Sequence, residues 1–498
     1  MGLKSKLSIL FARYIVSKQK AWMDEPIATS RADFNKLIEK GKKTAFGIDH
    51  NFDGIKSYED FKKNVPIRDY EGLKPYIERV KDGEKDVLWP GLPIYFCKTS
   101  GTTSGSKYIP LTKDSIPNHI HSARNALLHY IVDSGNTEFV DGKMTFLQGS
   151  PILNKKGIIP TGRLSGIVAN YVPNYLQKNR MPTYETNCID DWEQKVDKIV
   201  EETIVEDMRL ISGIPSWVQM YFEKLINSSD KVTIKEIFPH FSLFVYGGVN
   251  YEPYRKHFEK LIGSSVDSIE LYPASEGFIA FQDKQDEKGL LLVLNSGIFY
   301  EFIVADTFHD EEVTRVSLED VELGVNYVLI INSNAGLWGY NIGDTIMFVS
   351  MQPYRLIVTG RIKHFISPFG EHVIGKEVEM AMSSAIEQFG GQVVEFTVAA
   401  EVSPKEGLPY HEWFIEFANE PDDLAAFKRA LDQALQEQNS YYYDLIQGNI
   451  LRELVIRSVT KEGFNAYMKS IGKLGGQNKV PRLSNDRKIA DGMQKFLK

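Results

Sequence analysis

The sequence predicts an α/β protein of at least two domains: a large N-terminal domain and a small α+β domain at the C-terminal end. A chain of 498 residues is too long for one ordinary hydrophobic core. Two strand-like segments run into turns that carry paired glycines, Gly247-Gly248, or a carboxylate, Glu276. Such turns at strand ends are where α/β sheets place ligands. Beyond residue 365, strand-like and helix-like segments alternate over a length typical of a compact α+β unit.

Hydrophobic periodicity predicts the elements of the N-terminal domain in order. Residues 3–45 are expected to be helical, because Leu7, Phe11, Tyr14 and Ile15 recur on one side of a helix. Further helices are expected at 114–134, 192–211, 218–226 and 251–262. Short apolar runs bounded by turn residues predict strands at 92–97, 241–246, 268–272, 290–294, 299–304, 326–332, 345–349 and 355–359.

The C-terminal domain begins after a short charged joint, Gly360 to Lys363. We place the boundary at 361–365, which gives domains of residues 1–361 and 362–498. A helix is expected at 376–389, because Val378, Met382 and Ala385 fall on one face. The remaining elements are expected to be strands at 393–402, 412–417 and 453–459, and helices at 422–438 and 462–470.

Composition and charge narrow the classes of function. Hydrophobic residues make up 43% of the chain and charged residues 25%, as in globular proteins. The formal net charge of −8 argues against a nucleic-acid partner, for which a dominant basic field is expected. Cys97 and Cys188 are the only cysteines, which excludes a disulfide scaffold and a structural zinc site and favours a reducing cytoplasm.

The N-terminal segment does not read as a targeting signal. Arg13 interrupts the apolar run from Leu7 to Val16, and no small-residue cleavage site follows. Lys6 stands where a myristoylation motif has Ser or Thr. No segment approaches the length of a membrane span. We therefore expect a soluble cytoplasmic protein with no membrane partner.

A loop of Gly, Ser and Thr follows the first predicted strand, within Lys98 to Leu111. Glycines leave room for backbone N–H groups to approach phosphate oxygens, hydroxyls add donors, and Lys107 adds a positive charge. The spacing from Gly101 to Gly105 and the presence of Tyr108 exclude the Walker-type loop. The loop alone leaves two interpretations open: a phosphate cradle, or a polar surface loop.

Three further patterns follow the loop along the chain. They are Tyr246-Gly-Gly-Val249, Tyr272-Pro-Ala-Ser-Glu276 and Tyr340-Asn-Ile-Gly-Asp344. Together with Gly360-Arg361, they resemble the ordered motifs of the adenylate-forming superfamily of acyl-CoA synthetases, adenylation domains and luciferases. The resemblance implies a large N-terminal adenylate-forming domain with mixed sheets, helices and a β-barrel-like part. It also implies a small C-terminal domain that moves.

Within that superfamily, the chain is identified as a member of the auxin-responsive-promoter acyl acid amido synthetases, the Gretchen Hagen three family. The segments that carry this resemblance span nearly the whole chain: Gly213-Ile-Pro-Ser-Trp217, Tyr340 to Asp344, Leu435 to Tyr441 and Gly475 to Arg482. In plant members an arginine usually occupies the position of Asn341, and the chain is shorter than theirs. The resemblance implies ATP-dependent activation of a small carboxylic acid and transfer of the acyl group to an amine, typically an amino acid.

The resemblance also implies roles for individual residues. Glu276 would ligate magnesium, Asp344 would accept hydrogen bonds from the ribose diol, and Lys479 would meet the α-phosphate and acyl oxygen during adenylation. Glu276 and Lys479 are thus the expected catalytic residues. Contacts with ATP are expected from Thr99, Ser100, Gly101, Thr102, Thr103, Ser104, Lys107, Gly247, Gly248, Val249, Tyr272, Ala274, Ser275, Glu276, Tyr340, Asp344 and Arg361.

Several alternatives stay open at this point. Glu276 and Asp344 also suit ordinary turns, Tyr272 and Tyr340 suit the core, and Lys479 suits a solvated surface. Glu371 and His372 are candidates for the base that relieves the amine of its proton, although a surface position is the plainer reading of both. At the level of function, an acyl-CoA ligase and a nucleotide-binding protein without catalysis are the two alternatives.

Overall fold

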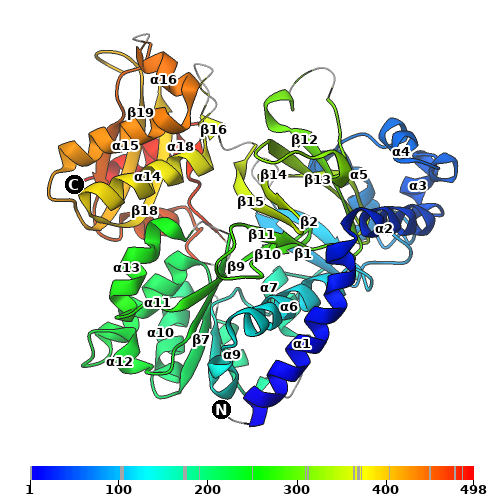
Figure 1. The fold of residues 1–498 in the computed structure, drawn as a ribbon, viewed down its shortest axis with the longest axis horizontal. Coiled ribbons are helices and arrows are strands. Elements are labelled where there is room, and N and C mark those ends of the chain that lie inside the picture. The colour runs from blue at the N-terminus through cyan, green and yellow to red at the C-terminus, as the bar shows by residue number, and fades with distance from the viewer. Residues whose placement is uncertain are drawn as a thin grey trace. The chain divides into compact units, whose positions relative to one another are not determined.

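The computed structural model describes residues 3–100, 106–171, 177–189, 191–248, 251–308, 310, 313–362, 365–366, 371, 373–402, 404–447, 450–475, 478–484 and 486–498. The chain folds into two compact units, and each is described by itself (Figure 1). Unit 1 comprises Met1–Gly213, Phe238–Gly248 and Val266–Ile357. Unit 2 comprises Ile214–Ile237, Val249–Ser265 and Val358–Lys498.

Unit 1 is built around one large mixed sheet. Its strands lie in the order β12-β13-β14-β15-β11-β10-β9-β8-β7-β3-β6. The pairs from β6 to β9 are parallel, whereas β9 to β11, β11 with β15, and β12 to β14 pair antiparallel. A second sheet has the order β2-β1-β5-β4. The mixed α/β class predicted from the sequence is confirmed.

The elements counted with unit 1 have the following bounds. The strands are β1 Tyr95–Ser100, β2 Ser106–Leu111, β3 Lys143–Phe146, β4 Asn154–Lys156, β5 Ile159–Gly162, β6 Arg180–Met181, β7 Met208–Ser212, β8 Leu243–Gly247, β9 Asp267–Ala274, β10 Gly277–Phe281, β11 Leu290–Leu292, β12 Ile298–Val304, β13 Asn326–Ser333, β14 Leu337–Met351 and β15 Tyr354–Arg361. The helices are α1 Leu3–Asp24, α2 Pro26–Gly41, α3 Ala45–Asp49, α4 Tyr58–Asn64, α5 Tyr70–Lys81, α6 Ile116–Ser134, α7 Leu164–Ala169, α9 Tyr184–Asn187 and α10 Trp192–Thr203.

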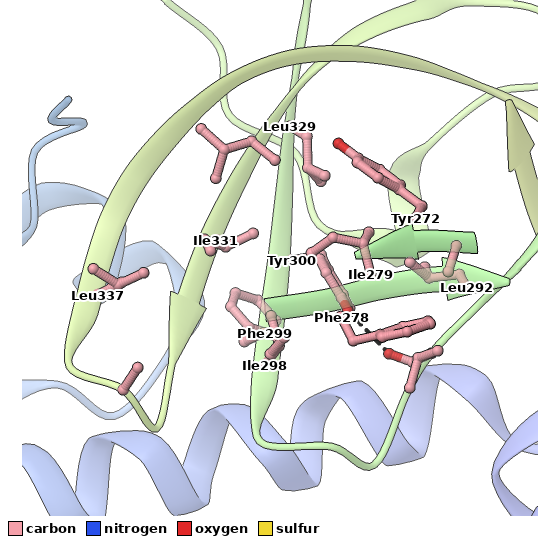
Figure 2. Close-up of a cluster of buried hydrophobic side chains, with 14 of the residues drawn as sticks. Tyr272, Phe278, Ile279, Leu292, Ile298, Phe299, Tyr300, Leu329, Ile331 and Leu337 are labelled. Atoms are coloured by element: carbon pink, nitrogen blue, oxygen red, sulfur yellow. Dashed lines mark hydrogen bonds between the residues drawn. The ribbon is translucent and has the colours of Figure 1, made fainter. Parts of the chain in front are cut away.

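The core of unit 1 lies where the antiparallel strands meet the end of β9. Figure 2 shows Tyr272 and Phe278 from the β9–β10 hairpin packed with Leu329 and Ile331 of β13. The hydroxyl of Tyr300 in this cluster donates to the carbonyl oxygen of Val293 at 3.0 Å, which satisfies a buried polar group. The hairpin that carries Glu276 is thus backed by a close-packed apolar wall.

Unit 2 is an α+β layer with helices against a four-stranded sheet of order β20-β19-β18-β21. Its strands are β16 Phe365–Ile366, β17 Val373–Ile374, β18 Gln392–Glu401, β19 Tyr410–Asn419, β20 Val455–Val459 and β21 Leu483–Ser484. Its helices are α11 Pro215–Asn227, α12 Ile234–Ile237, α13 Glu252–Ile262, α14 Gly375–Phe389, α15 Leu424–Gln438, α16 Ser440–Gln447, α17 Gly463–Ser470 and α18 Lys488–Met493.

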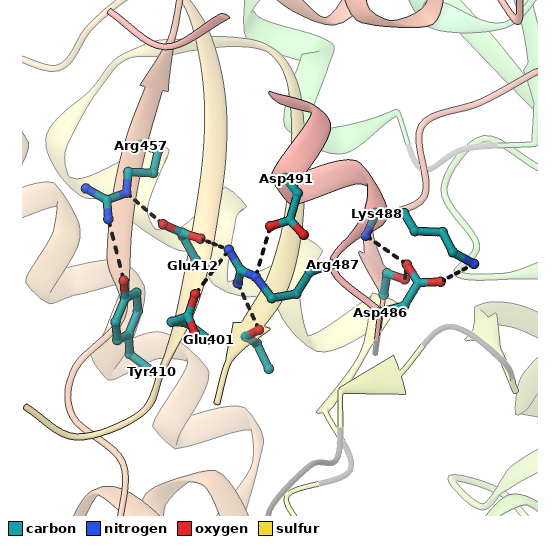
Figure 3. Close-up of polar contacts among 10 residues, drawn as sticks. Glu401, Tyr410, Glu412, Arg457, Asp486, Arg487, Lys488 and Asp491 are labelled. Atoms are coloured by element: carbon teal, nitrogen blue, oxygen red, sulfur yellow. Dashed lines mark hydrogen bonds and ion pairs between the residues drawn. The ribbon is translucent and has the colours of Figure 1, made fainter. Parts of the chain in front are cut away.

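A cluster of charges ties α18 to the sheet of unit 2 (Figure 3). The buried Glu412 of β19 accepts from Arg457 Nε at 2.7 Å and from Arg487 Nη2 at 2.7 Å. Arg487 Nη1 also donates to the carbonyl oxygen of Ala400 at 2.9 Å. Because two cations share one buried carboxylate, removing Glu412 would leave both guanidinium groups without their main partner.

The two units are not continuous segments of the sequence. β15 ends at Arg361, the residue at which the sequence placed the end of the first domain, and Val358 is where unit 2 resumes. The helices α11 to α13, although they come earlier in the chain, belong to unit 2 because α13 packs on α14 and β18. The domain limits 1–361 and 362–498 stay a prediction.

One predicted helix is wrong in its second half. The expected helix at 192–211 ends as α10 at Thr203, and its last residues form β7 instead. Leu210 and Ile211 pair in parallel with β3 on one side and β8 on the other. Sheet pairing on both edges outweighs the local helical preference of this segment.

Candidate active site

The hairpin between β9 and β10 forms the first part of the candidate site. Ala274 pairs with Gly277, so Ser275 and Glu276 form a two-residue turn between the strands. The Glu276 side chain is half-buried. The carboxylate of Glu276 is therefore held at a short turn between two paired strands, where it remains accessible to a ligand.

The end of β1 lies against this turn. Cys97 Sγ donates to Ser275 Oγ at 3.2 Å. Burial, helped by the nearby charge of Glu276, raises the pKa of the Cys97 thiol to about 12. The thiol is therefore neutral at physiological pH and serves as a weak hydrogen-bond donor. Since Thr99 is two residues further along β1, the start of the glycine loop is close to Glu276.

Lys107 stands opposite Thr99 on the paired strand β2. The ladder joins Thr99 with Lys107 and Ser100 with Ser106, so the glycine loop closes this hairpin. Lys107 Nζ lies 5.8 Å from the centre of the Tyr70 ring, a cation–π contact from α5. The positive charge of Lys107 is thus held by α5 at the start of β2, across from Thr99.

Asn118 of α6 holds the other end of the Glu276 turn. Phe278 N–H donates to Asn118 Oδ1 at 2.7 Å, and Asn118 Nδ2 donates to Phe278 O at 3.2 Å. The asparagine side chain is buried. Both backbone groups of Phe278 are therefore satisfied from α6. The turn is fixed by Cys97 before Glu276 and by Asn118 after it.

Asp344 is joined to the same hairpin through Tyr272. The Tyr272 hydroxyl donates to Asp344 Oδ2 at 2.6 Å, and this links β9 with β14. Asp344 is half-buried, whereas Tyr272 is 8% exposed. A carboxylate has lone pairs for several donors, so Asp344 can accept further hydrogen bonds from a diol.

The paired glycines lie beside Tyr272 at the end of the neighbouring strand. Gly247 of β8 pairs with Leu271 of β9, and a Cβ on Gly247 would come within 2.5 Å of the Leu271 carbonyl oxygen. Gly248 has a φ of +85°, which favours glycine. A side chain at either position would disturb this turn, because it would meet the backbone of β9 at Gly247 and would be strained at Gly248.

Tyr340 occupies a different environment from the other predicted residues. Its side chain is fully buried in the core of unit 1, and β14 there forms a bridge with Arg68. The aromatic ring is therefore not accessible to a ligand in this structure. Gly343 has a φ of +86° and lies where the pairing of β14 with β13 shifts register, just before Asp344.

Arg361 and Lys479 belong to unit 2 and are both exposed. Lys479 precedes a segment that is firmly held: the Thr397 hydroxyl donates to the Pro481 carbonyl oxygen at 2.6 Å, and Val398 N–H donates to the Arg482 carbonyl oxygen at 2.8 Å. Arg482 Nη1 also donates to the Phe396 carbonyl oxygen at 2.8 Å and contacts Glu395. Lys479 is thus anchored to β18 through the residues that follow it.

The expected surface position of Glu371 is wrong. Its side chain is fully buried and accepts from His411 Nε2 at 3.0 Å, and Asn439 donates to its backbone carbonyl oxygen. A buried carboxylate is stable only when it is paired, and His411 supplies that partner. His372 lies outside the described residues.

The predicted site residues that the structure describes thus fall into three groups. Contacts and strand pairs connect the larger group within unit 1: Thr99, Ser100, Lys107, Gly247, Gly248, Tyr272, Ala274, Ser275, Glu276 and Asp344. Tyr340 is in the core, and Arg361 and Lys479 are in unit 2. Outside the described residues lie Gly101, Thr102, Thr103, Ser104 and Val249.

The motifs did not reveal two residues that shape the site, Cys97 and Asn118. The sequence marks Cys97 only as one of two cysteines, because its partner Ser275 is 178 residues away. For Asn118 there was a weak signal: an asparagine, which is a poor helix former, on the apolar side of a predicted helix.

Comparisons with known proteins match the chain to one protein family. Three family models match it in order: the GH3 family N-terminal domain at residues 16–190, the central domain at 291–361 and the C-terminal domain at 376–488. Jasmonoyl–L-amino acid synthetase JAR4 of Nicotiana attenuata is 23% identical over 90% of this chain and 89% of its own length. Indole-3-acetic acid-amido synthetase GH3.3 of Arabidopsis thaliana is 22% identical over 86% and 85%, respectively.

Solved structures share the fold. The GH3.15 acyl acid amido synthetase in complex with 2,4-DB superposes with a TM-score of 0.79 at 15% identity, and the match covers 98% of this chain and 96% of that chain. A 2-hydroxyisobutyryl-CoA ligase in the postadenylation state has a TM-score of 0.59 at 12% identity over 94% and 91%. The two-domain architecture of these enzymes is the one expected from the sequence motifs.

Proposed function

Because the chain belongs to the GH3 family, we propose that it is an ATP-dependent acyl acid amido synthetase, a ligase that joins a small carboxylic acid to an amino acid. Relatives across most of its length are named as acid–amino acid synthetases. The observation that carries the proposal is the connection of Thr99, Glu276 and Asp344 through Cys97–Ser275 and Tyr272–Asp344. These two hydrogen bonds join residues that are far apart in sequence.

The first half-reaction makes the acid reactive. A carboxylate is a poor acyl donor because oxide would have to leave. Its oxygen attacks the α-phosphorus of ATP, the bond to the β-phosphate oxygen breaks, and pyrophosphate leaves with that electron pair. The product is an acyl-adenylate, from which AMP can leave. Charge develops on phosphate oxygens in this step, so oriented donors and cations accelerate it.

Residues of unit 1 suit the binding of ATP. Asp344, oriented by Tyr272, would accept from the ribose hydroxyls, and the turn at Gly247-Gly248 would admit the adenine ring. The loop that follows Thr99, with Lys107 across the hairpin, would hold the phosphates. In the adenylation step, Lys479 of unit 2 would supply a positive charge to the α-phosphate.

Magnesium fits the donor set at Glu276. Among the residues that the structure describes, no group of three or more His, Cys, Asp or Glu side chains forms a metal cage. Magnesium in nucleotide enzymes is usually held by one or two carboxylates together with phosphate oxygens, and one half-buried carboxylate at a fixed turn meets that requirement. The ion would supply charge neutralisation at the phosphates.

The second half-reaction forms the amide. A neutral amine attacks the acyl carbon, the bond to the AMP oxygen breaks, and the amine loses a proton to a base. Glu371 is an unsuitable base because it is fully buried against His411. We also propose that the enzyme works in the cytoplasm, where ATP is available and Cys97 and Cys188 stay reduced.

Two linked measurements test the proposal. The protein is incubated with ATP, magnesium and a panel of carboxylic acids, and acid-dependent exchange of labelled pyrophosphate into ATP is followed. Amino acids or coenzyme A are then added separately, and the acyl product is identified by mass. We expect exchange with at least one acid and an amide product. Asp344→Ala is the control, and it should need a higher ATP concentration for the same exchange.

Each contrary result has a definite meaning. A thioester without any amide would assign the chain to acyl-CoA ligases and overturn the proposal. No exchange with any acid, despite ATP binding by calorimetry, would make it a nucleotide-binding protein without catalysis.

A further inference from the structure

Helix α1 presents a row of large apolar side chains to solvent. Leu7, Leu10, Phe11 and Tyr14 are 57%, 64%, 47% and 54% exposed. Their spacing of three and four residues places them on one face of the helix. We refer to these four residues as the α1 stripe. Contiguous exposed apolar side chains of this size mark an interaction surface rather than ordinary surface scatter.

The opposite face of α1 is fastened to unit 1. Ser5 Oγ donates to Asp141 Oδ2 at 2.6 Å, and Ala12 is fully buried. Gln19 Oε1 lies 3.1 Å from His129 Nε2 of α6, and the two helices run beside each other in Figure 1. Since this inner face is already packed, the α1 stripe has no apolar surface of its own unit to turn towards.

Exposed cations line both sides of the α1 stripe. At 100° per residue, Lys4 falls on one side of it, and Lys6, Arg13 and Lys20 fall on the other. Lys18 follows Tyr14 by four residues and lies in line with the stripe itself. Lys18 Nζ lies 4.3 Å over the Tyr14 ring. The only acidic residue of the helix is its last, Asp24, although the whole chain carries a net charge of −8. The positive charge is therefore concentrated at the stripe.

We propose that α1 binds the surface of a membrane that contains anionic lipids, with the α1 stripe buried among the lipid chains and the flanking cations at the headgroups. An apolar row with basic residues along both sides matches a flat anionic interface. A second copy of the chain fits less well, because a two-fold contact through the same patch would bring the cations of both helices together. The occupant is therefore an anionic lipid surface.

This surface binding differs from spanning a membrane. No helix among the described residues is long and apolar enough to cross one. The sequence predicts no membrane partner because it has no membrane span and no targeting signal, and an interfacial helix is neither of these. The inference also does not depend on the proposed enzymatic activity.

Vesicle flotation with the full chain tests the proposal. Vesicles of phosphatidylcholine alone are compared with vesicles of phosphatidylcholine and phosphatidylglycerol, at low and high salt. We expect binding to the anionic vesicles only, weakened by salt. Leu10→Gln with Phe11→Gln should lower binding by about tenfold or more, since two large apolar side chains are lost. Lys6→Gln with Arg13→Gln should lower it by about thirtyfold.

A matched control removes exposed apolar side chains elsewhere. Val205 and Val232 are 84% and 73% exposed, so Val205→Gln with Val232→Gln should leave vesicle binding unchanged. All substituted residues are exposed, and unaltered thermal unfolding will confirm that the variants fold. Absence of binding to anionic vesicles, or wild-type binding by the Leu10/Phe11 variant, overturns the proposal. Light scattering that shows a dimer dissociated by that variant, without vesicle binding, would assign the stripe to a second copy instead.

Discussion

The Tyr272 hydroxyl donates a hydrogen bond to Asp344 at 2.6 Å and so joins the end of β9 to the middle of β14. Tyr272 is packed in the core of unit 1 (Figure 2). Asp344 is only half-buried. The tyrosine therefore acts as a buried support that sets the direction of an accessible carboxylate. A group that is to accept two ribose hydroxyls has to be held in such a way.

Replacing Tyr272 with phenylalanine removes this support without changing the shape of the core. We expect Tyr272→Phe to raise the KM for ATP by about threefold to tenfold, because a hydrogen bond to a charged group is lost. Pyrophosphate exchange at varied ATP measures the effect. Tyr130→Phe is the matched control, since Tyr130 also donates to an aspartate, Asp267, at 2.6 Å. If Tyr272→Phe weakens ATP binding equally in the Asp344→Ala background, Tyr272 does not act through Asp344.

Lys479 should affect the rate of adenylation more than ATP binding. We expect Lys479→Ala to lower the rate of acid-dependent pyrophosphate exchange by about a hundredfold, with the KM for ATP little changed, because its charge would serve the transition state. Asp344→Ala should show the reverse pattern. Lys473→Ala, an exposed lysine shortly before it, is the control. Equal and small effects of Lys479→Ala and Asp344→Ala on both parameters would mean that the site is misassigned.

Much of the fold could be predicted from the sequence because its signals are local. The strand expected at 299–304 is β12, Ile298–Val304, and the helix expected at 376–389 is α14, Gly375–Phe389. Apolar periodicity and flanking turn residues are contained within each such segment. The order of the motifs along the chain added the family and hence the class of fold.

The remaining features depend on contacts between distant segments. Whether Leu210 and Ile211 continue a helix or join a sheet is decided by β3 and β8, on either side of them. Tyr340, expected at the nucleotide, is buried because β14 runs through the core beside Arg68. The motif predicts residue types at a site, and only the packing decides which side chains face a ligand.

Asn118 should position Glu276 through the backbone of Phe278. We expect Asn118→Ala to lower the free energy of unfolding by about 2–4 kcal/mol, because two buried backbone groups lose their partner. It should also raise the magnesium concentration needed for half-maximal pyrophosphate exchange, because the turn that carries Glu276 is loosened. The magnesium dependence separates a positioning role from a merely structural one.

Two further variants keep the Asn118 prediction testable. Asn118→Asp retains an acceptor for Phe278 N–H and should show a weaker form of both effects. Asn187→Ala removes another buried asparagine that donates to a backbone carbonyl, that of Pro182. It should destabilise the protein and leave the magnesium dependence unchanged. A parallel shift in Asn187→Ala would show that loss of stability alone produces the effect.

Glu416 should make unit 2 less stable as the pH rises. Burial raises the pKa of its carboxyl group to about 7, although the N–H groups of Phe464 and Glu462 donate to it. Between its ordinary pKa of 4.5 and about 7, the folded state binds more protons than the unfolded state. The stability contributed by this group is therefore complete below that range and is lost as the pH rises through it, by at most about 3 kcal/mol.

Glu416→Gln removes this dependence and keeps a polar group of the same size. Denaturant unfolding from pH 4 to pH 8 should show the variant gaining stability relative to the wild type as the pH rises. Glu420→Gln is the control of opposite sign, because Lys498 donates to Glu420 at 2.7 Å and holds the pKa of that carboxyl group below its ordinary value. Without that bond, Glu420→Gln should have a lower free energy of unfolding than the wild type at neutral pH. At acidic pH, where the carboxyl group is protonated, the two should be equally stable. If Glu416→Gln and the wild type run parallel across this range, the carboxyl group is ionised in both states and the raised pKa is wrong.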